Sequence, residues 1–424
     1  MRSLLIVTAL LIGISSKLFA QFDFKTLDKE TYDYFLKGDY RNLKKTADTM
    51  LQSGIDYYFL RMRLGVLAFN NQMYSSALKD FSKALEFNSL DTISRELIYK
   101  SYLFSGRKAD ARLYLESIPS DKRNAILKNE GKPFTTEFFA GSFTSTNDEV
   151  LYSTNSLNYE AVKSSFSINT GAEASFLTRF RGTINYTNYR KTGVIYSPSN
   201  PAGKNLNFSQ DQIYAKLTGS VFPGWDFSGF GHFAFYNETI TLGPQGNRVT
   251  HNKSVAEYLG GFGISKNEWK IRTGANVSMS NFSNSSQVRG EGYFTWLPKG
   301  NLNLYLTSCW MGQTDNNWGG TYQVSQEIGF KLSRSLWMES GIVKGNSFLY
   351  ARNQGLLMNN SFQIPVTTIY GNIILLPWKR FNISLSPFYS RNEVYSWDLS
   401  SYTRTNKLNI NSFGGSFKLI YKIN

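Results

Sequence analysis

Cysteine and histidine are almost absent from this chain, which contains one Cys and two His among its 424 residues. A single cysteine, Cys309, cannot form an intramolecular disulfide, so the composition excludes a disulfide scaffold. A structural zinc site usually needs four Cys or His ligands, and Cys309, His232 and His251 are too few. We therefore expect no metal and no cofactor.

Long hydrophobic runs are also lacking after the first residues. Residues 1–20 combine the basic Arg2, an apolar stretch from Leu4 to Ile14 and a small Ala20, which predicts a secretory signal peptide. No later segment approaches the roughly 20 apolar residues that a membrane-spanning helix needs, so any membrane insertion must use strands. A signal peptide together with spanning strands predicts a location in a Gram-negative outer membrane.

The region from residue 134 to the end has a repeated alternation of apolar and polar residues. In Trp269–Ser280 the odd positions carry Trp, Ile, Thr, Ala, Val and Met, whereas the even positions carry Lys, Arg, Gly, Asn and Ser. Such a strand has one face suited to lipid and one suited to water. This pattern predicts a transmembrane antiparallel β-barrel over residues 134–424.

The links between the expected strands alternate between short and long. Short links are expected at 178–179, 223–224, 265–268, 298–300, 333–335 and 377–380, and longer polar loops near 145–160, 193–206, 242–252, 281–286, 314–319, 350–361 and 396–406. Short turns on the periplasmic side and longer loops outside are typical of outer-membrane barrels. The count is 14 strands, with 12 as the alternative because Pro365 and the apolar run 373–376 break the alternation.

The positions of the tryptophans fit the same barrel orientation, with the short turns at the periplasmic side. All eight lie in the expected barrel, and five lie within three residues of a short turn: Trp225, Trp269, Trp296, Trp337 and Trp378. Tryptophan at this depth is typical of an interfacial girdle.

A different pattern, helical, covers residues 21–131. Leu64 and Gly65, followed by Ala77, Phe81 and Ala84, match the spacing of a tetratricopeptide repeat, with Gly65 where two helices pack closely. Weaker copies lie on either side, so two to three repeats are expected, with a small helical bundle as the alternative. The repeats are expected to hold a periplasmic protein partner, or else simply to pack under the barrel mouth. Pro133 ends this region.

The net charge of +15 suggests an anionic partner. Because the excess lies on an expected barrel outside the cytoplasm, outer-membrane lipid, lipopolysaccharide phosphates or an anionic solute are expected, and nucleic acid is not. Strand register places basic residues inward near the short turns, opposed by Asp226, and acidic residues further along. The basic residues are Arg181, Lys270, Arg272, Lys331, Lys418 and Lys422; the acidic ones are Glu173, Glu238, Glu257 and Glu291.

These positions predict a basic constriction that favours anions. The alternative is that the charges pair across the lumen and plug it.

No enzyme is expected. His232 faces inward on a strand, but register counting places it opposite Lys216 and no serine follows it, so the arrangement of barrel-embedded hydrolases is missing. Aromatic residues in the outer loops, such as Trp318, Tyr395 and Trp397, are of a type that stacks on sugars.

The combination of signal peptide, repeats and barrel resembles the tetratricopeptide-fused outer-membrane barrels, which include YaiO-like proteins and the exopolysaccharide-export porins. The last strand, with Phe417, Leu419, Tyr421 and Ile423 on one face, looks like the C-terminal signal read by the insertion machinery, although Asn424 replaces the usual final aromatic. The resemblance implies a channel or export pore for an anionic solute or polysaccharide. The alternative is a non-conducting scaffold that anchors the repeats.

Overall fold

The computed structural model describes residues 24–130, 136–150, 159–176, 179–197, 200–242, 249–282, 285–316, 319–347, 350–352, 354, 356–359, 364–378, 381–398 and 403–423. The signal peptide expected over residues 1–20 lies outside these ranges, as does Trp318. The chain divides into two compact units, Met1–Tyr102 and Leu103–Asn424, and each is described by itself.

The first unit is helical. Its helices are α2 (Phe24–Lys37), α3 (Tyr40–Gln52), α4 (Tyr58–Asn70), α5 (Tyr74–Phe87) and most of α6 (Thr92–Phe104). Helix α3 begins at Asp39, whose carboxylate accepts a hydrogen bond from the Asn42 amide at 3.0 Å and so caps the helix. Short turns make α2 and α3, and α4 and α5, packed helical pairs. None of the described helices combines the length and the hydropathy needed to cross a membrane.

Helices α4 and α5 approach each other most closely at Gly65. A Cβ atom on Gly65 would lie 2.6 Å from Cε1 of Phe81, a distance that real side chains do not reach. Phe81 is fully buried together with Ala77 and Ala84, and Leu64 is 4% exposed. The residues singled out by the repeat spacing therefore form the contact between these two helices.

Two arginines of α4 bind carboxylates on α2, on α5 and in the turn before α4. Arg61 contacts Asp56 at 2.7 Å and Asp80 of α5 at 2.8 Å, and Arg63 contacts Asp28 of α2 at 2.5 Å. Burial raises the pKa of Asp80, and its hydrogen bond to Arg61 opposes that rise. Because an unpaired buried charge is costly, these contacts fix how the helices are placed against each other.

The second unit begins before the change from helix to strand. It contains the end of α6, α7 (Lys108–Glu116), α8 (Ser120–Glu130) and the strands. The strands are β1 (Thr136–Val150), β2 (Tyr159–Phe176), β3 (Phe180–Ser197), β4 (Asn200–Phe222), β5 (Trp225–Leu242), β6 (Val249–Asn267), β7 (Ile271–Ser280), β8 (Gln287–Trp296), β9 (Leu304–Asp315), β10 (Gly319–Lys331), β11 (Leu336–Gly345), β12 (Tyr350–Arg352), β13 (Leu357–Asn359), β14 (Ile364–Trp378), β15 (Phe381–Asp398) and β16 (Thr403–Ile423).

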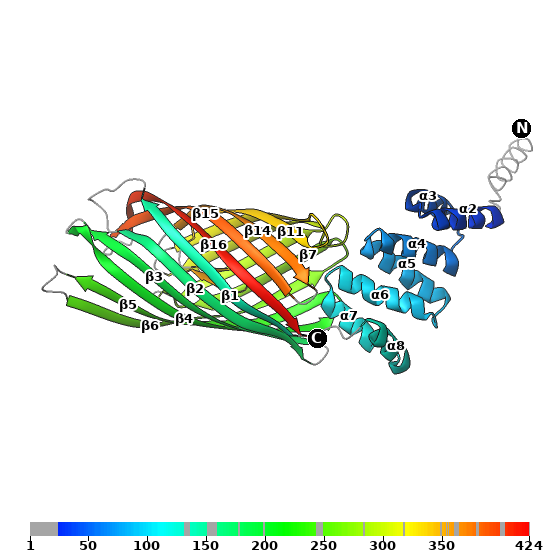
Figure 1. The fold of residues 1–424 in the computed structure, drawn as a ribbon, viewed down its shortest axis with the longest axis horizontal. Helices are drawn as coiled ribbons and strands as arrows, with labels where there is room; N and C mark the ends of the chain where they lie inside the picture. The colour runs from blue at the N-terminus through cyan, green and yellow to red at the C-terminus, as the bar shows by residue number, and fades with distance from the viewer. Residues whose placement is uncertain are drawn as a thin grey trace, which may run out of the picture. The chain divides into compact units, whose positions relative to one another are not determined.

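Long tilted strands form one closed antiparallel barrel (Figure 1). The order is β1-β16-β15-β14-β11-β10-β9-β8-β7-β6-β5-β4-β3-β2, and β12 and β13 form a separate two-stranded sheet. The first and last strands of the barrel pair from Thr136 opposite Ile423 to Val150 opposite Ile410. Closure leaves no strand edge in the barrel unpaired, which is the condition for a sheet surrounded by lipid.

Several expected turns lie where the sequence placed them, and one loop does not. Pro223 and Gly224 join β4 to β5, and residues 332–335 join β10 to β11. The long loop expected near 193–206 is wrong, because β3 continues to Ser197 and β4 begins at Asn200. The polar residues of this segment lie in a continued ladder, since strand preference depends on the neighbouring strand more than on residue type.

The ambiguous segment around Pro365 is a strand. Pro365 lies opposite Asn392 of β15, and the ladder of β14 with β11 begins only at Thr367. Proline cannot donate a hydrogen bond, but at this place no β11 residue needs its amide.

We predict that Gly65→Ala destabilises the helical unit by about 1–3 kcal/mol, because the added methyl group collides with Phe81. Thermal unfolding of the full chain followed by far-UV circular dichroism measures the loss. The double variant Gly65→Ala/Phe81→Leu is the control: its destabilisation should fall below the sum of the two single variants. Strict additivity would show that the two residues do not share this contact.

Candidate functional site

The two faces of the barrel wall differ in chemistry. On β5, Phe227, Phe233 and Phe235 are 40–53% exposed on the outer face, whereas Asp226 and Ser228 point into the barrel. On β7, Ile271, Val277 and Met279 are exposed and Arg272 and Asn276 point inward. The wall is therefore apolar outside and polar inside, as the alternation of the sequence predicts.

A cavity of about 1070 Å³ lies inside the barrel. Strands β2 to β11, β14 and β15 contribute to its lining, and Gly106 borders it from the turn between α6 and α7. Five acidic residues line it, Glu173, Asp226, Glu291, Glu327 and Glu339, against three basic ones, Arg181, Lys216 and Arg272. Its volume is at the upper end of the range for small-molecule sites.

Tyrosine rings on the cavity wall lie across glycines of the neighbouring strand. Tyr305 on β9 pairs with Gly329 on β10, and Tyr370 on β14 pairs with Gly341 on β11. A Cβ atom on either glycine would overlap the tyrosine ring. Tyr293 on β8 is placed over Gly274 on β7 in the same way. Each ring can therefore lie along the wall instead of filling the lumen.

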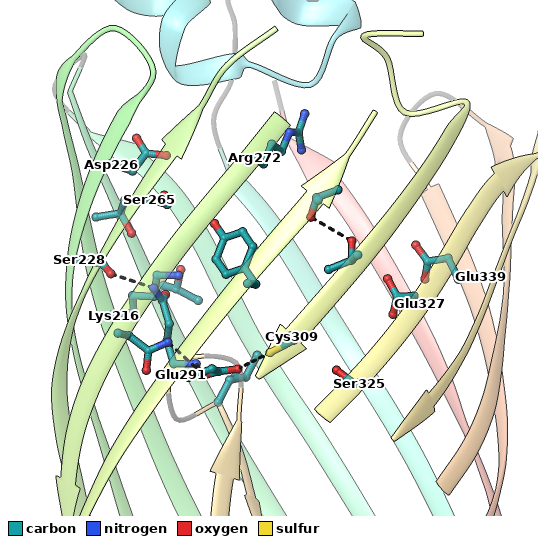
Figure 2. A pocket seen from close by; sticks show the side chains of 18 of the residues that line it. Lys216, Asp226, Ser228, Ser265, Arg272, Glu291, Cys309, Ser325, Glu327 and Glu339 are labelled. Atoms are coloured by element: carbon teal, nitrogen blue, oxygen red, sulfur yellow. Dashed lines mark hydrogen bonds between the residues drawn. The ribbon is translucent and has the colours of Figure 1, made fainter. Parts of the chain in front are cut away.

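Each of these tyrosines reaches a polar group one strand beyond its glycine. The Tyr305 hydroxyl donates to Glu339, which pairs with Gly329, and the Tyr370 hydroxyl donates to Glu327 at 2.7 Å. Tyr293 bonds Ser265, which pairs with Gly274. Asn372 donates to the second oxygen of Glu339 at 2.6 Å. Glu327 and Glu339, which lie near each other in Figure 2, are thus held in fixed positions by these hydrogen bonds.

Glu291 is a third fixed carboxylate in the cavity. It is 7% exposed and accepts hydrogen bonds from Asn276 at 3.1 Å, Cys309 at 3.5 Å and the Gln354 amide at 3.4 Å. Figure 2 shows Glu291 and Cys309 close together on the wall. Glu291 therefore connects strands β7 and β9 to the segment that contains β12 and β13.

The described part of the segment between β11 and β14 enters the lumen. The Gln354 side chain donates to Ser228 on β5 at 3.1 Å. The backbone carbonyl of Gln354 accepts from the Tyr214 hydroxyl on β4 at 3.3 Å. Ala351 is 1% exposed within an apolar cluster formed with Tyr214, Phe230, Leu259, Phe282 and Ile364, against which Leu356 packs. The segment thus crosses the lumen from β11 to the β4–β8 wall and borders the cavity at Gln354 and Leu356.

Polar side chains also fill the lumen outside the cavity. Arg289 is 2% exposed, donates to Gln313 at 3.0 and 3.1 Å, and lies over the Phe282 ring. Asp315 accepts from Ser285 and from Gln287 at 2.7 Å. His232 is 2% exposed and lies 3.1 Å from Gln212. The expected position of His232 opposite Lys216 is wrong, because β4 pairs Tyr214 with His232 and Lys216 with Phe230.

At the short-turn end, the second unit's helical residues contact the barrel wall. Asp110 of α7 accepts from the Gly224 amide at 2.5 Å and from Arg107 at 2.7 Å. Arg272 donates to the Ser105 carbonyl at 2.8 Å, and Arg112 donates to Ser175 at 3.0 Å. These contacts explain why residues from Leu103 onward group with the barrel, earlier than the boundary expected near residue 133.

The residues expected to line the lumen divide into two sets. Arg181, Asp226, Arg272 and Glu291 line the cavity. The others do not. Lys270 is exposed in the turn after β6, and Lys331 lies 4.5 Å above the Trp337 ring. Glu257 is 2% exposed on the inner face of β6, and Lys418 lies on β16.

Of the basic residues expected to form a constriction, Arg181 and Arg272 line the cavity, and the constriction stays a prediction. Glu327 and Glu339 line the same cavity as Arg272, and sequence counting missed both, along with Lys216. Trp337 also departs from the expected girdle, because it alternates with the cavity residue Glu339 and its indole donates inward to Leu302 at 3.3 Å. Trp269 and Trp296 are 47% and 48% exposed, as a girdle requires. The sequence contained a signal for one of these acids, since Ser325 and Glu327 are polar, lie two residues apart and so share the inner face of β10.

Among the described residues, no group of His, Cys, Asp and Glu side chains could hold a metal ion. The fixed groups of the cavity are hydrogen-bonded carboxylates, hydroxyls and amides.

No protein-family model matches this chain, and no curated protein matches it significantly. Solved structures with a similar arrangement include a Pseudomonas aeruginosa FadL homologue, at 7% identity and a TM-score of 0.46 over 68% of this chain and 90% of the other. The Pseudomonas putida toluene transporter TodX matches at 7% identity and 0.46, over 69% and 91%. The translocator domain of the autotransporter NalP from Neisseria meningitidis matches at 9% and 0.35, over 76% and 99%. All three scores are below 0.5, so the function must be argued from the site.

We predict that Gly329→Ala destabilises the barrel by about 1–3 kcal/mol and displaces Tyr305 from Glu339, because the methyl group takes the place of the ring. Urea unfolding of the protein refolded into vesicles measures the change. Gly312→Ala is the matched control, since a Cβ atom there has no neighbour within 4 Å. Equal effects of the two substitutions would contradict the role given to the glycine.

Proposed function

We propose that this protein is a gated outer-membrane channel for small polar solutes. The barrel is fourteen-stranded and spans the membrane, residues 1–20 are its signal peptide, and the short-turn end faces the periplasm. The observation that carries the proposal is a closed barrel with exposed apolar side chains outside and a polar cavity of about 1070 Å³ inside. Its outer surface contacts lipid and lipopolysaccharide.

The gate is the segment with β12 and β13. Among its described residues, it is held on the β4–β8 wall by hydrogen bonds of Gln354 to Ser228, Tyr214 and Glu291 and by the packing of Ala351 and Leu356. Such contacts are few enough to be broken and remade, so the segment can leave the lumen without disturbing the barrel ladder. A lumen that is otherwise lined by polar groups then becomes continuous.

The helical repeats recruit a periplasmic protein. Their tetratricopeptide-like packing around Gly65 and Phe81 supports this part of the proposal. The solute, however, differs from the one expected at first. The cavity has more acidic than basic residues, so it does not favour a simple anion, and the β12–β13 segment leaves no room for a polysaccharide in this conformation.

A non-conducting scaffold is the second candidate, because side chains such as Arg289 and His232 fill the lumen beyond the cavity. In that case the barrel only anchors the repeats in the membrane.

We predict that replacing residues 350–359 by a flexible Gly-Ser linker of equal length raises single-channel conductance at least several-fold. The physical reason is that the Gln354 and Ala351 contacts that fill the lumen are lost. Recordings from the refolded full-length protein in planar bilayers, at fixed salt, measure it. The control is a Gly-Ser linker that replaces residues 332–335, at the short-turn end, residue for residue. Silence of both the full chain and the 350–359 variant would favour the scaffold.

The single cysteine is an internal reporter of access to the cavity. Cys309 lines the cavity and donates to Glu291. We predict that a membrane-impermeant thiol reagent labels it at least tenfold faster in the 350–359 variant than in the full chain. Mass spectrometry of timed samples measures the rate, and Cys309→Ser should take up no label. Equal rates would show that this segment does not control access.

A further inference from the structure

One wall of the cavity is acidic. Among the lining residues on β8 to β15 there are three carboxylates, Glu291, Glu327 and Glu339, and no basic residue. Tyr305, Tyr370 and Asn372 hold two of them in place. A fixed carboxylate pair surrounded by phenol rings is suited to an ammonium group, which the rings attract through their π faces.

The other wall offers hydrogen-bond donors without acceptors. Thr218 is 4% exposed and lines the cavity, and within the described structure its hydroxyl makes no hydrogen bond. Arg181, which pairs with Thr218 across β3 and β4, likewise has an Nε without a hydrogen bond, since Glu173 lies 3.6 Å away. Buried polar groups are normally satisfied, so these donors indicate a ligand that brings an acceptor.

The charges around these donors favour a carboxylate. Lys216 lies two residues from Thr218 on the same face, and Arg272 on β7 adds a positive charge between the two walls. Of the two acids nearby, Glu173 pairs with Arg181, and Asp226 accepts from Ser220 at 2.5 Å and from Asn267 at 3.5 Å. This wall thus has two bases and two acids, whereas the facing wall has three carboxylates, so the field across the cavity points toward the acidic wall.

The two walls are opposite each other. In the closed strand order, β4 and β11 are seven steps apart in either direction, and Figure 2 shows Lys216 on one side and Glu327 and Glu339 on the other. With strands about 4.8 Å apart and tilted by about 40°, a barrel of this order is roughly 28 Å across between backbones. Side chains take up on the order of 10 Å, and an extended chain at about 3.5 Å per residue bridges the rest with four or five residues.

We propose that the cavity binds short zwitterionic peptides of about four residues. The N-terminal ammonium lies between Glu327 and Glu339, and the C-terminal carboxylate accepts from Arg181 and Thr218. Backbone amides of the peptide meet the hydroxyl and amide side chains between the walls. This inference names the solute class of the proposed channel and rests on the assignment of the cavity as its solute path.

Equilibrium dialysis of the refolded full-length protein tests the proposal. The probes are tetraalanine, N-acetyl-tetraalanine, tetraalanine amide and free alanine, each equilibrated overnight so that slow entry past Gln354 does not limit binding. We expect tetraalanine to bind, each single cap to weaken binding at least tenfold, and alanine to bind at least tenfold more weakly. Equal binding of all four probes would overturn the proposal.

Matched variants assign each end of the peptide to its wall. Glu327→Gln/Glu339→Gln should abolish discrimination against the acetylated peptide and keep discrimination against the amide. Arg181→Gln/Thr218→Val should do the reverse. Glu268→Gln, in an exposed turn, is the control and should behave as the unchanged chain. The mobility of unheated samples in electrophoresis shows that each variant is folded, and folded variants that keep both discriminations would overturn the assignment.

Failure of this inference and failure of the channel are distinguishable in the same preparation. Conductance of the 350–359 variant without binding that depends on the peptide termini overturns the peptide site and leaves the channel. Terminus-dependent binding without conductance in any variant supports the site and overturns the channel, leaving an anchored protein that binds peptides.

Discussion

A tyrosine ring lying across a glycine of the next strand is the interaction on which the shape of this lumen depends. Tyr293, Tyr305 and Tyr370 would each project into the barrel if their neighbours carried a side chain. Because Gly274, Gly329 and Gly341 accommodate the rings, the space stays open and the hydroxyls reach one strand further. The same contacts thus determine both the volume of the cavity and the positions of its carboxylates.

The lumen is bordered at two levels by different kinds of contact. At the short-turn end the contacts are charged and involve the backbone, as where Asp110 accepts from the Gly224 amide. At the other level the β12–β13 segment relies on the apolar packing of Ala351 and on hydrogen bonds of Gln354, one of them to the Glu291 carboxylate.

What the cavity can bind depends on how its charges are distributed between its two walls, and not only on its net charge. Three acids lie on β8, β10 and β11, whereas the three bases lie on β3, β4 and β7 and the other two acids on β2 and β5. Counting charges along the chain suggested an anion-selective pore, since it took the basic residues near the short turns as one ring. In the barrel, Lys270 lies in an exposed turn, and Lys331, over the inward Trp337 ring, is not among the residues that line the cavity.

The sequence by itself determined the antiparallel barrel after a helical region, the inward and outward faces of the strands, and most of the short turns, because these depend on a period of two and on local turn residues. It also identified Gly65 and Phe81 and four of the cavity residues, Arg181, Asp226, Arg272 and Glu291. Only the tertiary structure decided which strands face each other, that Glu327 and Glu339 oppose Lys216, and that residues around Gln354 fold into the lumen. These features depend on pairing between distant strands, which a local pattern does not encode.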